Sequence, residues 1–192
     1  MQESDADILR QVQDGDVRQF ALLVDRYKDR ALTLALRLVR NREEAEELVQ
    51  DAFVRAYRNL RSFRGDSAFR TWFYRILYNV CMTSVRRRAK REPILHLDGQ
   101  PEMYESVPDT GMTTALDQLE EKEIAGILSD ELGKLPDKYR TALTLFYTEE
   151  MSYEEVGEIA GLPVGTVKSH LFRARSLLRE RLVNRLQEAV IP

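Results

Sequence analysis

Apolar residues in the first ninety positions recur at helical spacing in three separate stretches. The stripes are Phe20, Leu23, Val24, Tyr27, Ala31, Leu34, Ala35 and Leu38; then Ala45, Leu48, Val49, Ala52, Phe53, Ala56 and Tyr57; and then Phe69, Trp72, Phe73, Ile76, Leu77 and Val80. Apolar positions three and four residues apart form one face of a helix that packs against a core. The pattern therefore predicts three helices around one core, with Tyr57 inside it.

The helical pattern stops between Glu92 and about Thr114, where prolines and glycines interrupt it. This stretch is acidic and has few apolar residues, so we expect a flexible linker. Helical spacing returns from Leu116 to the end of the chain, and strand-like alternation is not found. The sequence thus predicts an all-α protein of two small helical domains, residues 1–91 and 116–192, joined by a flexible acidic linker at 92–115.

Two helices are predicted to meet at a tight turn near the C-terminus. The segment Ser152–Glu155 has the spacing of a capping box, so a helix should begin directly after Ser152. Gly161 can adopt the left-handed conformation that ends this helix, and Pro163 suits the first turn of the next one. Gly157 is small enough for the two helices to approach closely. These signals indicate a helix-turn-helix, the motif that places its second helix in the major groove of DNA.

The second helix of this motif has an apolar side and a polar side. At 100° per residue, Gly165, Ser169, Phe172 and Ser176 project away from the apolar stripe, with Lys168, Arg173 and Arg179 at its edges. A phenylalanine is usually buried, but the outward angle of Phe172 also suits a base edge or a thymine methyl group. The basic residues are either a solvated surface or contacts to phosphates and bases. His170 lies on a flank of the helix.

The charge distribution supports contact with nucleic acid, although the net charge of the chain is −3. Residues 1–91 hold 19 Lys and Arg against 13 Asp and Glu, a net charge of +6. Residues 92–129 hold 1 against 9, a net charge of −8, and residues 130–192 hold 9 against 10. Within the last block, residues 161–185 carry six basic residues and one acidic residue. Two basic surfaces therefore flank an acidic middle.

The first domain combines aromatic and basic residues in a way that suits single-stranded DNA. The polar turn 61–67 contains Phe63, and Phe63 and Tyr78 fall outside the apolar stripes. Arg75 and Asn79 are one helical turn apart, and a run of basic residues follows at 86–91. Unstacked bases need a flat apolar partner, and the DNA backbone needs positive charge. The other aromatic residues of this stretch fit the buried stripe.

Two segments of the chain resemble a known family. They are LVQDAFVRAYRNLRSFRGDSAFRTWFYRILYN and SYEEVGEIAGLPVGTVKSHLFRAR, and they are similar to sigma factors of the extracytoplasmic-function group of bacterial RNA polymerase. The resemblance implies that residues 1–91 form sigma region 2, which docks on polymerase and melts the minus-ten element. It implies that residues 116–192 form sigma region 4, which reads the minus-thirty-five element.

The resemblance also assigns site residues. It implies docking on the β′ coiled coil of polymerase through Glu47, Gln50, Asp51, Val54 and Arg55. It implies minus-ten contacts, with a flipped base held near Phe63 and Asn79, from Ser62, Phe63, Arg64, Gly65, Asp66, Ser67, Arg75, Tyr78, Asn79, Arg86 and Arg87. It implies minus-thirty-five contacts from Thr166, Lys168, Ser169, His170, Phe172, Arg173 and Arg175. His170 departs from the pattern, because a basic residue is frequent at its position.

The partners that the resemblance implies are core RNA polymerase, through its β′ coiled coil and β flap, promoter DNA and an anti-sigma factor. A single cysteine, Cys81, excludes an internal disulfide and a thiolate zinc site and favours a reducing cytoplasm. The acidic start and the lack of an apolar run of about 18 residues predict neither export nor membrane insertion.

Two other classes of protein are alternatives to a sigma factor. The segment TVKSHLFRARSLL also resembles the output helix of LuxR-type response regulators, but their receiver domain needs alternating strands and helices, which the first ninety residues do not predict. An enzyme needs a nucleophile beside a base, a phosphate loop or a metal-ligand spacing, and the pattern contains none of these. We therefore expect no catalytic residues, no cofactor and no metal.

Overall fold

The computed structural model of the protein describes residues 3–91 and 121–190. Within these two ranges the chain consists of helices and turns and contains no strand, as the sequence predicts. The predicted linker at 92–115 lies outside the described residues. In the same ranges, none of the helices combines the length and the apolar character that crossing a bilayer would require.

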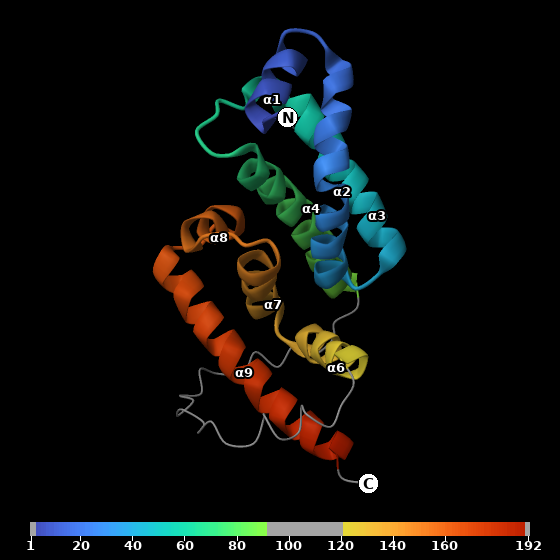
Figure 1. The fold of residues 1–192 in the computed structure, drawn as a ribbon, viewed down its shortest axis with the longest axis vertical. Helices are drawn as coiled ribbons and strands as arrows, with labels where there is room; N and C mark the ends of the chain where they lie inside the picture. The colour runs from blue at the N-terminus through green and yellow to red at the C-terminus, as the bar shows by residue number, and fades with distance from the viewer. Residues whose placement is uncertain (1–2, 92–120, 191–192) are drawn as a thin grey trace.

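The first range contains four α-helices that pack on one another (Figure 1). They are α1 (Asp5–Gln13), α2 (Phe20–Val39), α3 (Arg42–Asn59) and α4 (Phe69–Arg91), with short 3₁₀ turns η1 (Val17–Gln19) and η2 (Leu60–Ser62). The three predicted stripes lie on α2, α3 and α4, and these helices contact one another pairwise. Phe53 and Phe73 stack at the centre with ring centroids 4.4 Å apart. The three-helix core is therefore the one that the apolar spacing predicts.

Two details of this half differ from the sequence-based expectation. Helix α1 was not predicted, because it buries only Ile8, Leu9 and Val12; its N-terminus is capped by Ser4, whose hydroxyl accepts the backbone N–H of Asp7 at 3.2 Å. The prediction that Tyr57 is buried is wrong. Tyr57 lies in the last turn of α3 and is 42% exposed. The rings of Tyr57 and Phe20 meet edge to face, with their centroids 5.2 Å apart.

The second range contains the helix-turn-helix. Its elements are α6 (Glu121–Lys134), α7 (Asp137–Leu143), the π-helical turn η3 (Thr144–Thr148), α8 (Tyr153–Ala160) and α9 (Val164–Val190). The capping box forms as predicted: Ser152 accepts the N–H of Glu155 at 3.1 Å, and the carboxylate of Glu155 accepts the N–H of Ser152 at 2.9 Å. Gly161 ends α8 in the left-handed conformation, with φ of 68°. Helices α8 and α9 are therefore the predicted pair.

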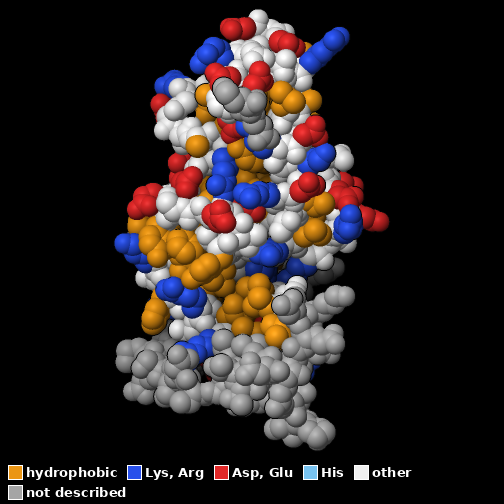
Figure 2. All heavy atoms as spheres, in the orientation of Figure 1, with side chains coloured by type: hydrophobic (Ala, Val, Ile, Leu, Met, Phe, Trp, Pro, Cys, Tyr) orange, Lys and Arg blue, Asp and Glu red, His pale blue; other side chains and the backbone are white. Residues whose placement is uncertain are grey.

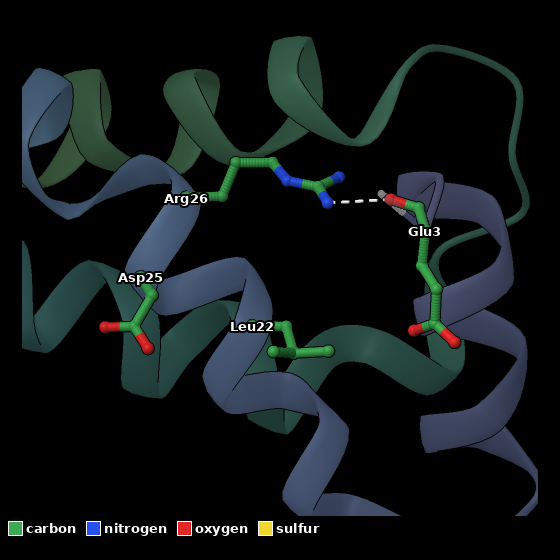
Figure 3. A pocket seen from close by; sticks show the side chains of 4 residues that line it. All are labelled: Glu3, Leu22, Asp25 and Arg26. Carbon is green, nitrogen blue, oxygen red and sulfur yellow. Dashed lines mark hydrogen bonds between the residues drawn. The ribbon is translucent and has the colours of Figure 1, made fainter. Parts of the chain in front are cut away.

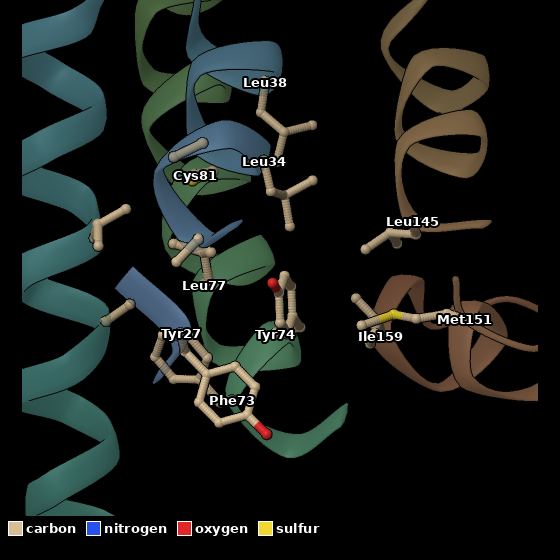
Figure 4. Close-up of a cluster of buried hydrophobic side chains, with 14 of the residues drawn as sticks. Tyr27, Leu34, Leu38, Phe73, Tyr74, Leu77, Cys81, Leu145, Met151 and Ile159 are labelled. Carbon is tan, nitrogen blue, oxygen red and sulfur yellow. The ribbon is translucent and has the colours of Figure 1, made fainter. Parts of the chain in front are cut away.

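The two halves pack against each other, a contact that the apolar spacing of the sequence does not predict. Helix α8 lies against α4, and α7 and η3 lie against α2. Leu145, Met151 and Ile159 point toward α2 and α4, on the side where Tyr74 lies (Figure 4). All four side chains are at most 2% exposed. One hydrophobic core therefore continues from the first half into the second.

The turn between α8 and α9 depends on the absence of a side chain at Gly157. A Cβ atom built at this position would lie 2.8 Å from the carbonyl oxygen of Leu162. We expect Gly157→Ala to lower the free energy of unfolding by about 1–3 kcal/mol, because the backbone of the turn must move. The measurement is chemical denaturation followed by circular dichroism.

A matched control is Gly126→Ala in α6, where an added Cβ meets nothing within 4 Å. This substitution should raise the stability by roughly 0.5–1 kcal/mol, because alanine restricts the unfolded chain. A Gly157→Ala variant as stable as Gly126→Ala would contradict the close approach of the two helices.

Candidate nucleic-acid interface

The N-terminal part of α9 separates its buried and exposed residues as the helical angle predicts. Val167, Leu171 and Ala174 are at most 2% exposed and hold the helix against α7 and α8. On the opposite side, Phe172 is 60% exposed, the largest value among the exposed large hydrophobic residues that the structure describes. Burial is the usual state of a phenylalanine, so a ring this exposed on a helix-turn-helix is available to contact a base or a thymine methyl group.

Polar residues with donor groups surround Phe172 on the same helix. Lys168, Ser169, Arg173 and Arg175 are all exposed. The Ser169 hydroxyl donates to the carbonyl oxygen of Gly165 at 2.9 Å. Thr166 is half-buried in the first turn. This surface therefore presents positive charge and hydrogen-bond donors, which suit DNA phosphates and base edges.

Two tyrosines outside α9, which the sequence pattern does not predict, contact cations of this surface. The ammonium group of Lys168 lies 5.4 Å from the centroid of the Tyr153 ring. Arg175 donates to the hydroxyl of Tyr147 at 3.3 Å. Both tyrosines pack on Phe146, with ring centroids 4.8 and 5.0 Å apart. No local spacing links these residues to α9, because they meet it only through the tertiary fold.

His170 differs from its neighbours, because its ring is used in packing. The ring meets the edge of Tyr139 with centroids 5.5 Å apart, and the Nδ1 atom is buried without a hydrogen-bond partner among the described residues. Burial, helped by the nearby charges of Lys138 and Arg173, lowers the pKa of His170 below 6.5. The neutral ring therefore stabilises the junction of α7 and α9.

The predicted minus-ten turn forms an exposed loop before α4. Ser62, Arg64, Gly65 and Asp66 are exposed, Ser67 is half-buried, and Gly65 adopts a left-handed φ of 79°. Phe63 is half-buried: its ring lies 5.1 Å from Trp72 and 6.2 Å from Phe69. The ring of Phe63 thus rests on α4 at the base of the loop and remains partly exposed.

Helix α4 carries the remaining predicted minus-ten residues. Arg75, Asn79, Arg86 and Arg87 are exposed, and Tyr78 is half-buried. Burial raises the pKa of Tyr78, so its hydroxyl stays protonated and can donate a hydrogen bond. Arg88 is held elsewhere: it pairs with Glu44 at 2.9 Å and donates to the carbonyl oxygen of Val39. The loop and the first three turns of α4 therefore form one surface with aromatic, amide and guanidinium groups.

The outward side of α3 carries the residues predicted to dock on polymerase. Glu47, Gln50, Val54 and Arg55 are exposed, Asp51 is half-buried, and Val54 is 45% exposed. Arg55 forms an ion pair with Asp51 at 2.9 Å. An exposed apolar residue among fixed charges suits a protein partner more than DNA, because acidic groups repel phosphates.

The remaining surface features that the structure describes lie outside the predicted sites. Figure 2 shows a mixture of acidic and basic side chains over the upper part of one face, and hydrophobic side chains gathered lower down. A shallow cavity of about 310 Å³ lies between the start of α1 and α2, lined by Glu3, Leu22, Asp25 and Arg26 (Figure 3). The guanidinium of Arg26 donates to the carbonyl oxygen of Glu3 at 2.7 Å across it. This cavity contains none of the predicted site residues.

Comparison with known proteins agrees with this arrangement. Residues 23–91 match the family model of sigma-70 region 2, and residues 125–178 match that of sigma-70 region 4. The chain is 39% identical to the ECF RNA polymerase sigma factor SigW of Bacillus subtilis (strain 168), over 91% of this chain and 94% of that protein. It is 40% identical to the RNA polymerase sigma-H factor of Pseudomonas aeruginosa, over 98% of each chain.

A solved structure agrees as well. The sigma factor RpoE from Bartonella quintana, in complex with the anti-sigma factor NepR, superposes with a TM-score of 0.65 at 25% identity, over 86% of this chain and 97% of that one. Two helical regions with these matches define a transcription factor of the sigma-70 type. The chain belongs to the ECF RNA polymerase sigma factors, which direct RNA polymerase to promoters.

The packing of His170 makes the fold sensitive to pH. Its folded pKa lies below the value of 6.5 that it has when exposed, so the unfolded chain binds more protons between these two values. Stability from the neutral ring is therefore present above about pH 6.5 and is lost as the pH falls. We expect the unfolding free energy of wild type to decrease relative to that of His170→Gln between about pH 7.5 and pH 5. Equal pH profiles for the two proteins would contradict this assignment.

Proposed function

We propose that this sigma factor contacts its promoter at two separate surfaces. The N-terminal part of α9 reads the duplex minus-thirty-five element, and the loop 62–67 with α4 binds the melted minus-ten element. The observation that carries this proposal is the pair of unusual aromatic positions. Phe172 is 60% exposed among cations, and Phe63 is half-buried with its ring 5.1 Å from that of Trp72. The first suits a groove with methyl groups, and the second suits an unstacked base.

The outer side of α3 is the proposed contact to core polymerase. This side lies on a different helix from either proposed DNA surface. It carries Glu47, Gln50, Asp51, Val54 and Arg55. Promoter contact and polymerase contact can therefore occur together. The region-4 half is the proposed contact to the β flap of polymerase. This contact would use a surface other than the reading side of α9, the side that carries Lys168, Phe172 and Arg173.

Control by an anti-sigma factor is also proposed for this chain. The support is the similarity to RpoE from Bartonella quintana, whose solved structure is a complex with the anti-sigma factor NepR. We infer that the chain acts in the cytoplasm, where RNA polymerase and the chromosome are found, and that it has no catalytic activity of its own.

Run-off transcription tests the proposal directly. Purified core polymerase is mixed with this chain and a set of promoter templates, and the transcripts are sized. The expected result is a discrete product that depends on the chain and on both promoter elements. A chain that fails to bind core polymerase, or that leaves transcription unchanged on every template, would overturn the proposed function.

Phe63→Ala tests the single-strand contact. We expect binding to duplex DNA to stay within twofold of wild type, because the reading side of α9 is untouched. Open-complex formation should fall roughly 5- to 150-fold, since a base-stacking contact is worth about 1–3 kcal/mol. Permanganate reactivity of unpaired thymines measures the bubble. Because Phe63 also packs on Trp72, thermal melting must show that the variant is folded. The control is Val17→Ala, which shortens an exposed apolar side chain outside the proposed sites.

Arg173→Ala tests the duplex contact. A bidentate base contact is worth about 1–3 kcal/mol of discrimination, so affinity for the preferred upstream element should fall roughly 5- to 150-fold. Affinity for unrelated duplex should fall much less. The matched control is Arg10→Ala, which removes an exposed arginine of α1. If Arg173→Ala weakens all duplexes equally, the residue contacts phosphate and reads no base.

A further inference from the structure

Two basic residues of α9 form a row along one edge of its reading side. At about 100° per residue, Lys168 and Arg175 lie roughly 40–60° to one side of Phe172, and Arg173 lies about 100° to the other side. Lys168 and Arg175 are two helical turns apart, which is about 10.5 Å along the axis. When such a helix lies in the major groove, cations at its edge face the phosphates of one DNA strand.

A cluster of three aromatic residues contacts both cations of this row. It consists of Phe146, Tyr147 and Tyr153. Phe146 packs against the core, stacks on Tyr153 with the ring planes 8° apart, and lies almost perpendicular to Tyr147, at 83°. The Tyr153 ring faces the ammonium group of Lys168, and the Tyr147 hydroxyl accepts a hydrogen bond from Arg175 at 3.3 Å. One packed set of rings therefore contacts two separate cations of α9.

The backbone that carries Tyr147 is unusual. In η3 the N–H of Glu149 donates to the carbonyl oxygen of Thr144 at 3.1 Å, five residues back, as in a π turn. Glu150 then has a φ of 51°, in the left-handed region that non-glycine residues rarely adopt. Such irregular backbone is often found at functional sites, because the structure around it must compensate for its cost.

The irregular segment turns nearby side chains in opposite directions. Glu149 is 0% exposed and accepts a hydrogen bond from the hydroxyl of Tyr74 on α4, with an oxygen–oxygen distance of 2.6 Å. Tyr147, two residues earlier, is 53% exposed and reaches Arg175. A tyrosine with its ring on other protein groups and its hydroxyl at the surface is typical of binding interfaces. The π turn therefore places a polar group beside α9 that α9 itself does not contain.

The hydrogen bond to Tyr147 affects how Arg175 can bind DNA. Arginine has a long side chain that loses much of its freedom when it binds a phosphate. Its guanidinium group has five N–H donors, so a bond to Tyr147 leaves others for a phosphate. A side chain that is already ordered loses less entropy on binding, and this raises affinity without a new contact to the ligand.

We propose that Tyr147 is a positioning residue for promoter binding. Through its hydroxyl it holds Arg175 in the orientation in which the guanidinium group contacts a phosphate beside the minus-thirty-five element. This inference rests on the proposed duplex contact of α9, and it extends the DNA-binding unit to η3, which precedes the helix-turn-helix. Tyr147, Arg175 and the rings around them all belong to the second half, so the arrangement does not require the first half.

A double-mutant cycle tests the coupling between the two residues. Holoenzyme is assembled from core polymerase and the full chain, and fluorescence anisotropy measures its affinity for a duplex with the preferred upstream element. Tyr147→Phe removes only a hydroxyl group, and we expect it to weaken binding roughly two- to tenfold, the range for ordering one long side chain. In the presence of Arg175→Ala the same substitution should change the affinity by less than about 1.5-fold, because its partner is gone.

The salt dependence of binding separates positioning from a purely structural role. Each lost phosphate contact reduces the slope of log affinity against log salt concentration by about 0.9. Arg175→Ala should reduce the slope by about this amount, and Tyr147→Phe by part of it, because the charge remains but is less ordered. Both side chains are exposed, so thermal melting should match wild type. Tyr57→Phe is the matched control: it alters an exposed tyrosine of α3 and should leave affinity and slope unchanged.

The outcomes separate this inference from the proposed function. Additive effects of the two substitutions, wild-type affinity of Tyr147→Phe, or an unchanged slope for Arg175→Ala would each overturn the positioning role. In all three cases the wild-type holoenzyme still prefers the upstream element, so the proposed function stands. A wild-type holoenzyme without preference for any duplex would contradict the proposed function, and the role of Tyr147 would fall with it.

Discussion

The structure depends on helix α4 being buried from two sides. Phe69, Phe73 and Leu77 face the core with α2 and α3, whereas Thr71 and Tyr74 face the second half. A helix that must satisfy two partners has few positions left for solvent, and in the first three turns of α4 these are the ones that carry Arg75 and Asn79. The same helix therefore fixes the hydrophobic core, the position of the second half and the surface proposed to bind single-stranded DNA.

Local chemistry made the helix-turn-helix predictable. The capping box at Ser152, the left-handed Gly161 and the small Gly157 act over a few residues, and each has a single structural meaning in its context. The three-helix core was predictable for a similar reason, since its stripes repeat at three- and four-residue intervals. The exposed position of Phe172 followed from the same geometry, because a helix with one buried side fixes the direction of every other side chain.

Contacts between distant segments were not predictable. The partner of Tyr74 is 75 residues away, and an aromatic residue in the middle of an apolar stretch gives no indication that its hydroxyl is used. Tyr57 was predicted to be buried, because it continues the stripe of α3, but in the last turn of this helix Phe20 covers only one edge of it and 42% of it stays exposed. One signal was available: in residues 69–81 of α4, apolar side chains occur around most of the helix circumference, which indicates a segment covered on more than one side. Only the three-dimensional structure shows that α8 is the element that covers the second side of α4.

The polar character of the contact between the halves has a physical consequence. Apolar cores are stabilised in proportion to buried area and have no preferred partner, so an interface made only of leucine and methionine would resist opening in proportion to its size. Hydrogen bonds between side chains behave differently, because water replaces both partners after separation and the net difference is small. Leu145, Met151 and Ile159 supply contact area, and Tyr74 with Glu149 supplies geometry. An interface of this mixed kind has a defined geometry, because the buried hydroxyl and carboxyl groups must meet each other while the apolar side chains around them add contact area.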